Sequence, residues 1–160
     1  MGRFARTSTL VLGAALALGG CKKDTEEQKV LRVIDDGVAA IEAGQVGDAM
    51  DLVADDFSDE NGTDKGMIKG YLAGQMLRGD RITIVRRDEN VKVDGTAATA
   101  SFDAAIFQGD RAKLKGVVPQ RSGTYRFTLT FRKDDGDWLV TKATWKNISA
   151  GSFLVDSIGD

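Results

Sequence analysis

The residue of this chain best suited to proton transfer is Asp103, an acidic side chain in the middle of an apolar strand pattern. The sequence holds no histidine, so the usual side chain that titrates near neutral pH, which is also the commonest metal ligand, is absent. A positioned carboxylate can still act as a base, and a phenol can donate a hydrogen bond to substrate. We therefore predict Asp103 as the candidate catalytic base, and Tyr71, Asp103 and Tyr125 as candidate residues of a ligand pocket.

Asp103 also has a purely structural interpretation. Side chains alternate between the two faces of a strand, so Asp103 points away from the face that Phe102 and Ala104 occupy. If that apolar pair faces the helices, Asp103 lies on the outer face and pairs with Arg126 or Arg132, a contact worth a few tenths to about 1 kcal/mol. A buried carboxylate without a partner would instead have a raised pKa and favour an enzyme. The two tyrosines lie on apolar stripes and also fit a core.

The segment Asp59-Glu60-Asn61-Gly62 has some of the residues of a calcium-binding loop. The full loop needs an acidic residue two positions before Asp59 and a glutamate six positions after Gly62. Phe57 and Ile68 stand at those positions, so the pattern fails. We expect no metal site and no cofactor.

Cys21 is the only cysteine of the chain and follows a short apolar run. Two basic residues precede that run, which covers residues 10–18, and glycines stand directly before Cys21. A basic region, an apolar region of roughly 7 to 15 residues and small residues before the cut make a secretion signal. The run is too short to cross a hydrocarbon core, which needs about 20 apolar residues. A plain cleaved signal with an incidental cysteine is the alternative, but an unpaired thiol is unfavourable in an oxidising compartment unless it is used.

The sequence Leu18-Gly19-Gly20-Cys21 resembles the lipobox of bacterial lipoproteins. The resemblance implies that residues 1–20 are a signal peptide, that cleavage falls between Gly20 and Cys21, and that the Cys21 thiol carries diacylglycerol. Two or more acyl chains, such as palmitate, give stable anchoring, so the expected partner of Cys21 is the membrane of a bacterial cell envelope. Lys22 is not the aspartate associated with inner-membrane retention in enterobacteria, so the resemblance favours the outer membrane.

The composition indicates a modestly acidic chain with one domain. It has 22 basic and 24 acidic residues, and the net charge falls from −2 to −4 when residues 1–20, with two basic residues and no acidic one, are removed. Nucleic-acid-binding proteins concentrate basic residues on one face, so we expect no nucleic-acid partner. Residues 21–28 are predicted to form a polar tether, residues 29–148 the domain, and residues 149–160 a tail with no clear period.

Apolar spacing predicts three helices before residue 80. The first carries residues 30, 33, 34, 38 and 41 on one stripe and ends near Gly44. A short helix covers about 47–54 and leads into Phe57. The third begins near Thr63 or Asp64 and ends at Gly79, with Met67, Ile68, Tyr71, Leu72 and Met76 on its buried face.

Gly66, Gly70 and Gly74 recur every four residues along the third helix. Each costs roughly 1 kcal/mol relative to alanine inside a helix, so some contact must offset the loss. One interpretation is a close approach of this helix to the sheet or to the first helix. The other is a helix pair between two copies of the protein, because small residues at this spacing allow close crossing.

From residue 81 the period of the apolar residues changes to two, which predicts strands. Alternation covers residues 81–93, 96–107, 125–132 and 138–145, and the hairpin turns Asp94-Gly95 and Asp135-Gly136 join the first pair and the second pair. Consecutive hairpins make an antiparallel sheet with one face available for the helices. The predicted class is therefore α+β.

The order of three helices followed by long strands resembles the nuclear transport factor two-like fold, which includes polyketide cyclase-like proteins. Val30 to Phe57 resembles its opening helices, and Thr124 to Lys146 resembles its last hairpin. The resemblance covers about residues 29–148, and a cystatin-like or small lipocalin-like arrangement is the alternative. It implies a strongly curved sheet of four to six antiparallel strands, wrapped as a cone around the first helix, with a pocket at the wide end.

Three functions are compatible with this architecture. We favour a binding or accessory module for a small apolar ligand or a protein partner, with no catalysis expected. Enzymes of this kind place an aspartate with histidine or tyrosine partners in the pocket, and an isomerase or cyclase using Asp103 as base is the second hypothesis. The third is a homodimerisation scaffold that uses the open face of the sheet.

Overall fold

The structure is a computed structural model of the 160-residue chain and describes residues 23–79, 81–109 and 122–155. Gly20 and Cys21, on which the signal and lipidation predictions rest, lie outside the described residues. The helices are α1 (Glu26–Glu42), α2 (Val46–Asp51), α3 (Lys65–Leu77) and α4 (Ala150–Val155). The strands are β1 (Val53–Asp59), β2 (Ile82–Asp94), β3 (Ala97–Gln108), β4 (Ser122–Asp134) and β5 (Asp137–Asn147).

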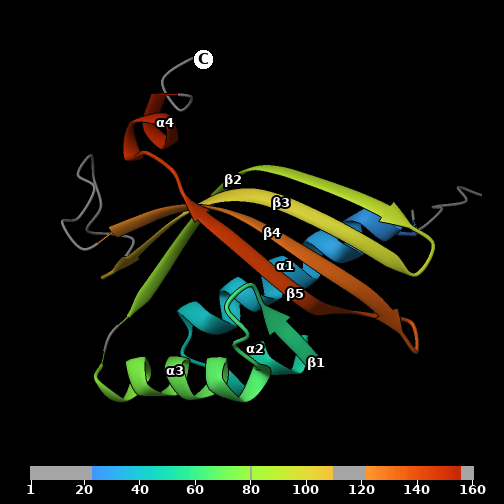
Figure 1. Cartoon of the computed structure of the whole chain (residues 1–160), viewed down its shortest axis with the longest axis horizontal. Helices are drawn as coiled ribbons and strands as arrows, with labels where there is room; N and C mark the ends of the chain where they lie inside the picture. The colour runs from blue at the N-terminus through green and yellow to red at the C-terminus, as the bar shows by residue number, and fades with distance from the viewer. Residues whose placement is uncertain (1–22, 80, 110–121, 156–160) are drawn as a thin grey trace, which may run out of the picture.

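Helix α1 begins with a capping box and lies across one face of the sheet (Figure 1). The Thr25 side chain accepts a hydrogen bond from the backbone of Gln28, and the Gln28 side chain accepts one from the backbone of Thr25, which satisfies two of the free donors at the helix start. Glu26 to Gln28 therefore form the first turn of α1, so the predicted tether extends too far. Val30 and Ile34 are buried, as the predicted stripe requires.

The strands form one curved, mixed sheet in the order β1-β5-β4-β3-β2. The pairs from β2 to β5 are antiparallel, as predicted, whereas β1 runs parallel to β5. Figure 1 shows α1 on one side of this sheet, with β1, α2 and α3 gathered near one end of α1. The described chain thus has the α+β class, with five strands.

Strand β1 corrects the prediction that the second helix continues to about residue 54. Helix α2 ends at Asp51, and the chain is extended from Val53. The segment buries Ala54, Phe57 and Asp59. Its exposed acidic residues Asp55 and Asp56 are unfavourable in strands, which is why the segment did not match a strand pattern. The predicted all-antiparallel sheet is wrong at this one edge.

The two hairpins have two-residue loops. Asp134 pairs with Asp137, which places Asp135 and Gly136 at the predicted turn, both with positive φ. In the other hairpin Asp94 pairs with Ala97, so the loop is Gly95-Thr96, one residue later than predicted. Gly95 has φ 59° at the first loop position, which fits the type II′ turn that favours glycine there.

Two apolar clusters hold the helices in place. The larger joins α1 to the sheet through Val30, Ile34, Phe102, Phe131 and Trp138, together with a row of β3 alanines. The smaller joins α1, α2 and α3 through Ala40, Ala49, Met50 and Leu72. No helix among the described residues is long and apolar enough to cross a membrane.

Helix α3 packs less completely than predicted. Its N-cap is Asp64, whose side chain accepts a hydrogen bond from the backbone of Met67 at 2.8 Å. Leu72 is buried, but Met67 is 61% and Tyr71 is 64% exposed. The prediction that both lie on the buried face is wrong, because α3 covers α2 and β1 at the edge of the domain and only one side of it meets them.

Candidate functional site

An aromatic surface crosses three strands on the face of the sheet that α1 covers. Phe102, Phe127 and Trp145 are directly paired residues of β3, β4 and β5, so they point to the same side. The ring centroids of Phe102 and Phe127 are 5.5 Å apart, and those of Phe127 and Trp145 are 6.1 Å apart. Tyr125 adjoins Phe127 at 6.0 Å. We call these four residues the aromatic surface.

The aromatic surface is covered unevenly. Phe102 is buried and belongs to the cluster under α1, whereas Tyr125, Phe127 and Trp145 keep part of their rings accessible. The ring spacings lie within the range at which aromatic pairs attract each other. The surface therefore extends the core outward and offers flat apolar area to another molecule.

Tyr125 has its position because residue 123 is a glycine. A Cβ atom placed on Gly123 would lie 2.3 Å from the Tyr125 ring and from its hydroxyl oxygen, far inside contact distance. The two residues are on the same face of β4, since side chains alternate along a strand. The missing side chain at Gly123 leaves the space that the tyrosine ring occupies.

Arg86 provides a cation beside the aromatic surface. Its guanidinium lies 5.6 Å from the centroid of the Phe102 ring, within the range of a cation–π contact. It pairs with Asp35 of α1, and its Nη2 lies 3.3 Å from Glu89 Oε1. Its buried Nη1 has no hydrogen-bond partner among the described residues. One buried donor nitrogen beside Phe102 is thus left unsatisfied.

Asp103 lies on the opposite face of the sheet. Arg126 donates from Nε and Nη2 to the two carboxylate oxygens at 2.6 and 2.8 Å. The carboxylate is buried, with 4% of its side chain exposed. The hydrogen bonds from Arg126 hold the pKa of Asp103 below its usual value, against the effect of burial. The predicted pairing with Arg126 is confirmed, and Arg132 pairs with Asp56 instead.

The structure does not bring the three candidate pocket residues together. Tyr125 is part of the aromatic surface, Asp103 is on the other side of the sheet, and Tyr71 lies on the exposed side of α3. The Tyr71 hydroxyl accepts a hydrogen bond from Gln75 of the same helix at 2.9 Å. A base with two phenol donors in one pocket is therefore not formed.

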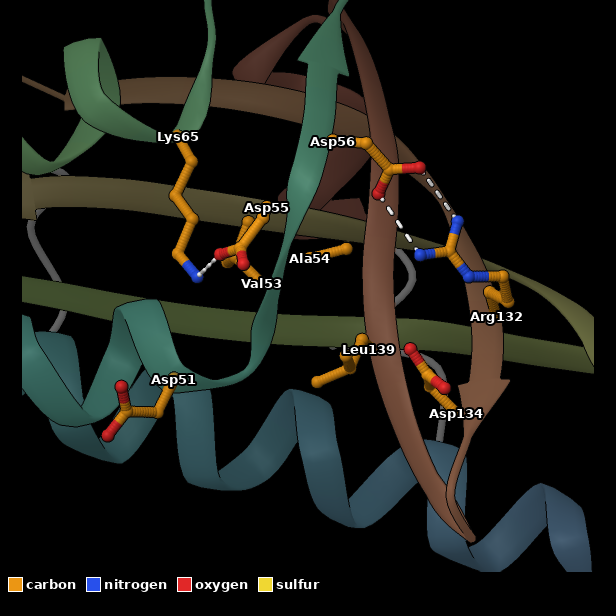
Figure 2. A pocket seen from close by; sticks show the side chains of 9 residues that line it. All are labelled: Asp51, Val53, Ala54, Asp55, Asp56, Lys65, Arg132, Asp134 and Leu139. Atoms are coloured by element: carbon orange, nitrogen blue, oxygen red, sulfur yellow. Dashed lines mark hydrogen bonds and ion pairs between the residues drawn. The ribbon is translucent and has the colours of Figure 1, made fainter.

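A polar hollow of about 390 Å³ lies between β1, the start of α3 and the hairpin of β4 and β5 (Figure 2). Four of its charged residues form two ion pairs. Lys65 contacts Asp55 at 2.8 Å, and Arg132 donates to both oxygens of Asp56 at 2.8 and 3.2 Å. The Arg132 hydrogen bonds lower the pKa of Asp56. The hollow is lined by Asp51, Val53, Ala54, Asp55, Asp56, Lys65, Arg132, Asp134 and Leu139.

The segment Asp59-Glu60-Asn61-Gly62, which has some of the residues of a calcium loop, folds as a turn. One carboxylate oxygen of Asp59 accepts hydrogen bonds from the backbone of Asn61 and of Thr63, both at 2.7 Å. These bonds lower the pKa of Asp59 although burial raises it. Over the described ranges no group of three or more acidic, histidine or cysteine side chains is arranged to hold a metal ion.

This chain is similar in structure to several solved proteins. No family model matches the sequence, and no curated protein matches it. An NTF2-like protein from Cytophaga hutchinsonii superposes with a TM-score of 0.63 at 16% identity, over 78% of this chain and 100% of that one. An NTF2-like protein with a cystatin-like fold from Novosphingobium aromaticivorans gives 0.61 at 18% identity, over 79% and 85%.

A third solved structure, an NTF2-like protein of unknown function from Pseudomonas putida, gives a TM-score of 0.58 at 18% identity, over 75% of this chain and 84% of that chain. At sequence identities this low, the similarity to these structures shows a shared fold alone. The resemblance inferred from the element order is thus confirmed by the helices on a curved sheet and by these superpositions. The described domain has the nuclear transport factor two-like fold, and the neighbour from Novosphingobium aromaticivorans shows that this fold and the cystatin-like arrangement are not exclusive alternatives.

Proposed function

We propose that this chain is a lipoprotein of the bacterial cell envelope, anchored through acylated Cys21, whose domain binds a small apolar ligand or an apolar segment of a protein partner. The binding part of the proposal is carried by one observation. The aromatic surface gathers four rings on the α1 side of the sheet, and three of them are only half covered. Apolar area of this kind is favourable to remove from water.

The unpaired Arg86 nitrogen beside the aromatic surface indicates which chemical groups a ligand would carry. Arg86 Nη1 is a buried donor without a partner among the described residues. A buried donor left unsatisfied costs free energy, so a ligand oxygen that reaches it would add affinity. A flat apolar molecule with an oxygen at one end fits both features.

The arrangement of Asp103 supports binding rather than proton transfer. A general base must come within hydrogen-bond distance of the proton that it removes. Both oxygens of Asp103 accept bonds from Arg126 on the face away from the aromatic surface. The isomerase or cyclase hypothesis therefore has no supporting contact at its candidate base.

The binding test is titration of the full chain with 1-anilinonaphthalene-8-sulfonate, an aromatic probe with one anionic group. We expect saturable binding whose Kd rises at least tenfold in Phe127→Ala. The matched control is Tyr71→Ala, which removes an exposed ring from α3 and is expected to leave the Kd unchanged. Circular dichroism checks that both variants are folded. An unchanged Kd in folded Phe127→Ala would contradict the proposed binding surface.

The anchor is tested separately by Cys21→Ser and fractionation of the cell envelope. The wild-type chain is expected in the membrane fraction after a wash without detergent, because two or more acyl chains hold it there. The serine variant is expected to leave that fraction. Retention of the variant in the membrane would contradict anchoring through Cys21.

A further inference from the structure

The side of the sheet opposite α1 presents three rows of polar side chains. Side chains alternate along a strand, so the residues next to those of the aromatic surface point away from α1. Figure 1 shows α1, α2 and α3 on the other side of the sheet, and the Phe153 ring of α4 lies 4.3 Å from the Arg87 guanidinium at one end of these rows. We call the rows the outer face. Read from β2 to β5, they are Arg87-Asp103-Arg126-Lys146, Asn90-Ser101-Thr128-Thr144 and Lys92-Thr99-Thr130-Lys142.

The outer face is positive although the chain is acidic. Its rows hold five basic residues, and two carboxylates, Asp103 and Asp88, pair with the arginines among them. Lys92, Lys142 and Lys146 are exposed, and none of them forms an ion pair with a described residue. Residues 21–160 together carry a net charge of −4. Attraction of an anionic partner is therefore concentrated on the outer face, while the rest of the surface repels it.

One pair of like charges on the outer face calls for an anion. Lys146 is directly opposite Arg126, and like charges at directly opposite positions destabilise a sheet. Arg126 has a carboxylate partner in its own row, whereas Lys146 has none among the described residues. In the next row Thr128 is paired with Thr144, and neither hydroxyl is hydrogen-bonded to a described side chain or backbone group. An anionic group above these four side chains would offset the repulsion and accept hydrogen bonds from both hydroxyls.

We propose that the outer face docks a polysaccharide that carries carboxylate or phosphate groups, in the cell envelope where the proposed anchor places the chain. Lys142 lies about 14 Å from Lys146 along β5 and about 14 Å from Lys92 across three strand spacings, so an extended ligand is needed to reach all three ammonium groups. Hydroxyl groups suited to hydrogen bonds with sugars lie between them, on Thr99, Ser101, Thr128, Thr130 and Thr144. The outer face is separate from the aromatic surface, so the two binding proposals can fail independently.

Two other anionic partners fit the outer face less well. Single-stranded nucleic acid uses aromatic side chains on which its bases stack, and the three rows hold none. An anionic bilayer would first meet the hairpin ends, because Glu26, at the start of α1 near the proposed anchor, is bonded to Lys133 and Trp138. Acidic residues that such a bilayer repels stand at those ends, namely Asp94, Asp134, Asp135 and Asp137.

The test is binding of the full chain, in mild non-ionic detergent, to immobilised carboxymethyl-dextran, with unmodified dextran as the uncharged probe. An acidic chain binds a polyanion only if one of its faces is positive. We expect binding to carboxymethyl-dextran at low salt and no binding to dextran. Binding should be lost in 1 M salt, where charges are screened beyond about 3 Å. Absence of binding to carboxymethyl-dextran at low salt would overturn the proposal.

A pair of lysine substitutions locates the binding. Lys142→Gln combined with Lys146→Gln is expected to raise the Kd for carboxymethyl-dextran at least tenfold. The matched control combines Lys23→Gln with Lys69→Gln, which removes two exposed lysines away from the outer face and changes the net charge equally. We expect it to change the Kd less than twofold, with circular dichroism as the check that both proteins are folded. Equal losses in the two proteins would overturn the proposal, because binding would then follow net charge.

The hydroxyl row tests whether the partner is a sugar. Thr128→Val combined with Thr144→Val removes two hydroxyls and keeps side chains that favour strands. We expect the Kd for carboxymethyl-dextran to rise about threefold and binding to polyglutamate, a polyanion without sugars, to stay the same. Equal changes for the two polymers would overturn the assignment to a polysaccharide.

Lysine acetylation of the wild-type chain separates a polysaccharide from a bilayer. The acylated chain is placed in phosphatidylcholine vesicles with or without phosphatidylglycerol, and mass spectrometry measures the modification of each lysine. We expect Lys92, Lys142 and Lys146 to react equally in both vesicles and at least threefold more slowly once carboxymethyl-dextran is added, with Lys69 unaffected. Protection of the three lysines by phosphatidylglycerol alone would overturn the proposal, because the outer face would then lie on lipid.

Discussion

Asp103 and Arg126 face each other across β3 and β4, and the guanidinium donates to both carboxylate oxygens at 2.6 and 2.8 Å. The pair lies on the side of the sheet away from the aromatic surface. The carboxylate that the sequence singles out for chemistry therefore joins two strands. Binding of an apolar ligand is better sought on the other face, where aromatic rings remain half covered.

Replacing Asp103 with asparagine distinguishes a structural role of this carboxylate from a direct role in ligand binding. Since Asp103 is 3% exposed and its bonds to Arg126 are charge-assisted, Asp103→Asn is expected to lower the free energy of unfolding by roughly 1–3 kcal/mol. Urea unfolding measures this change. Binding of 1-anilinonaphthalene-8-sulfonate is expected to stay the same. Asp56→Asn, which breaks an exposed pair, is the control with a smaller loss of stability. Loss of probe binding in folded Asp103→Asn would favour a direct role in the site.

Acid is expected to destabilise the domain through Glu26. Its carboxylate accepts bonds from Lys133, Lys29 and Trp138, and these lower its pKa from 4.5 to about 2. A lowered folded-state pKa adds stability that is present above the unfolded pKa and is lost as the pH falls through the folded one. The free energy of unfolding should therefore drop between about pH 4.5 and 2.

Glu26→Gln checks the origin of that acid sensitivity. It removes the titrating group, so the pH dependence of the urea midpoint over this window should be shallower than in the wild type. Asp36→Asn on the same helix is the matched control, because its carboxylate is exposed on α1. A wild-type slope in Glu26→Gln would contradict the assignment.

Gly123→Ala tests how Tyr125 is positioned. The added Cβ would lie 2.3 Å from the tyrosine ring, so the ring must leave its place on the aromatic surface. We expect weaker probe binding together with a changed near-ultraviolet circular dichroism signal from the aromatic side chains. Gly136→Ala, in the hairpin loop with φ 100°, is a control that strains the backbone elsewhere. An unchanged Kd in Gly123→Ala would exclude Tyr125 from the binding surface.

Phe131 tests the packing of α1 on the sheet. The side chain is 1% exposed and belongs to the larger apolar cluster. Phe131→Ala is expected to lower the free energy of unfolding by about 3–5 kcal/mol, since it removes buried area and leaves a cavity. Leu77→Ala, at a side chain 89% exposed in the single chain, should change it by less than about 0.5 kcal/mol. Equal effects would contradict the assigned core.

Elements with a strong period were predictable from the sequence. The apolar residues of α1 lie on one side of the helix, and those around Phe131 alternate along the strand. Such spacings of apolar residues predict helices and strands directly. The sequence does not predict strand β1, because the exposed acidic residues Asp55 and Asp56 interrupt its apolar positions. Met67 and Tyr71 match an apolar stripe, so the sequence predicts them as core residues. They are exposed because α3 lies at the edge of the domain.

The aromatic surface could not be predicted from the sequence, because its residues come together only through contacts between different strands. Tyr125 was identified as a candidate, but its neighbours Phe127 and Trp145 come together only through the register of three strands. Arg86 was overlooked, although a basic residue at the same parity as Ile84 on a half-buried strand is a usable signal. Its pairing with Asp35 of α1 arises from residues 51 positions apart, which spacing alone does not predict.

The most direct test of the account is native mass spectrometry of the full chain, extracted from its own envelope in mild detergent. The account predicts a chain that begins at an acylated Cys21 and carries an additional mass that is lost on denaturation. That mass would come from an apolar ligand or a bound partner segment. A chain with an unmodified Cys21 and no additional mass would contradict both the anchor and the binding function.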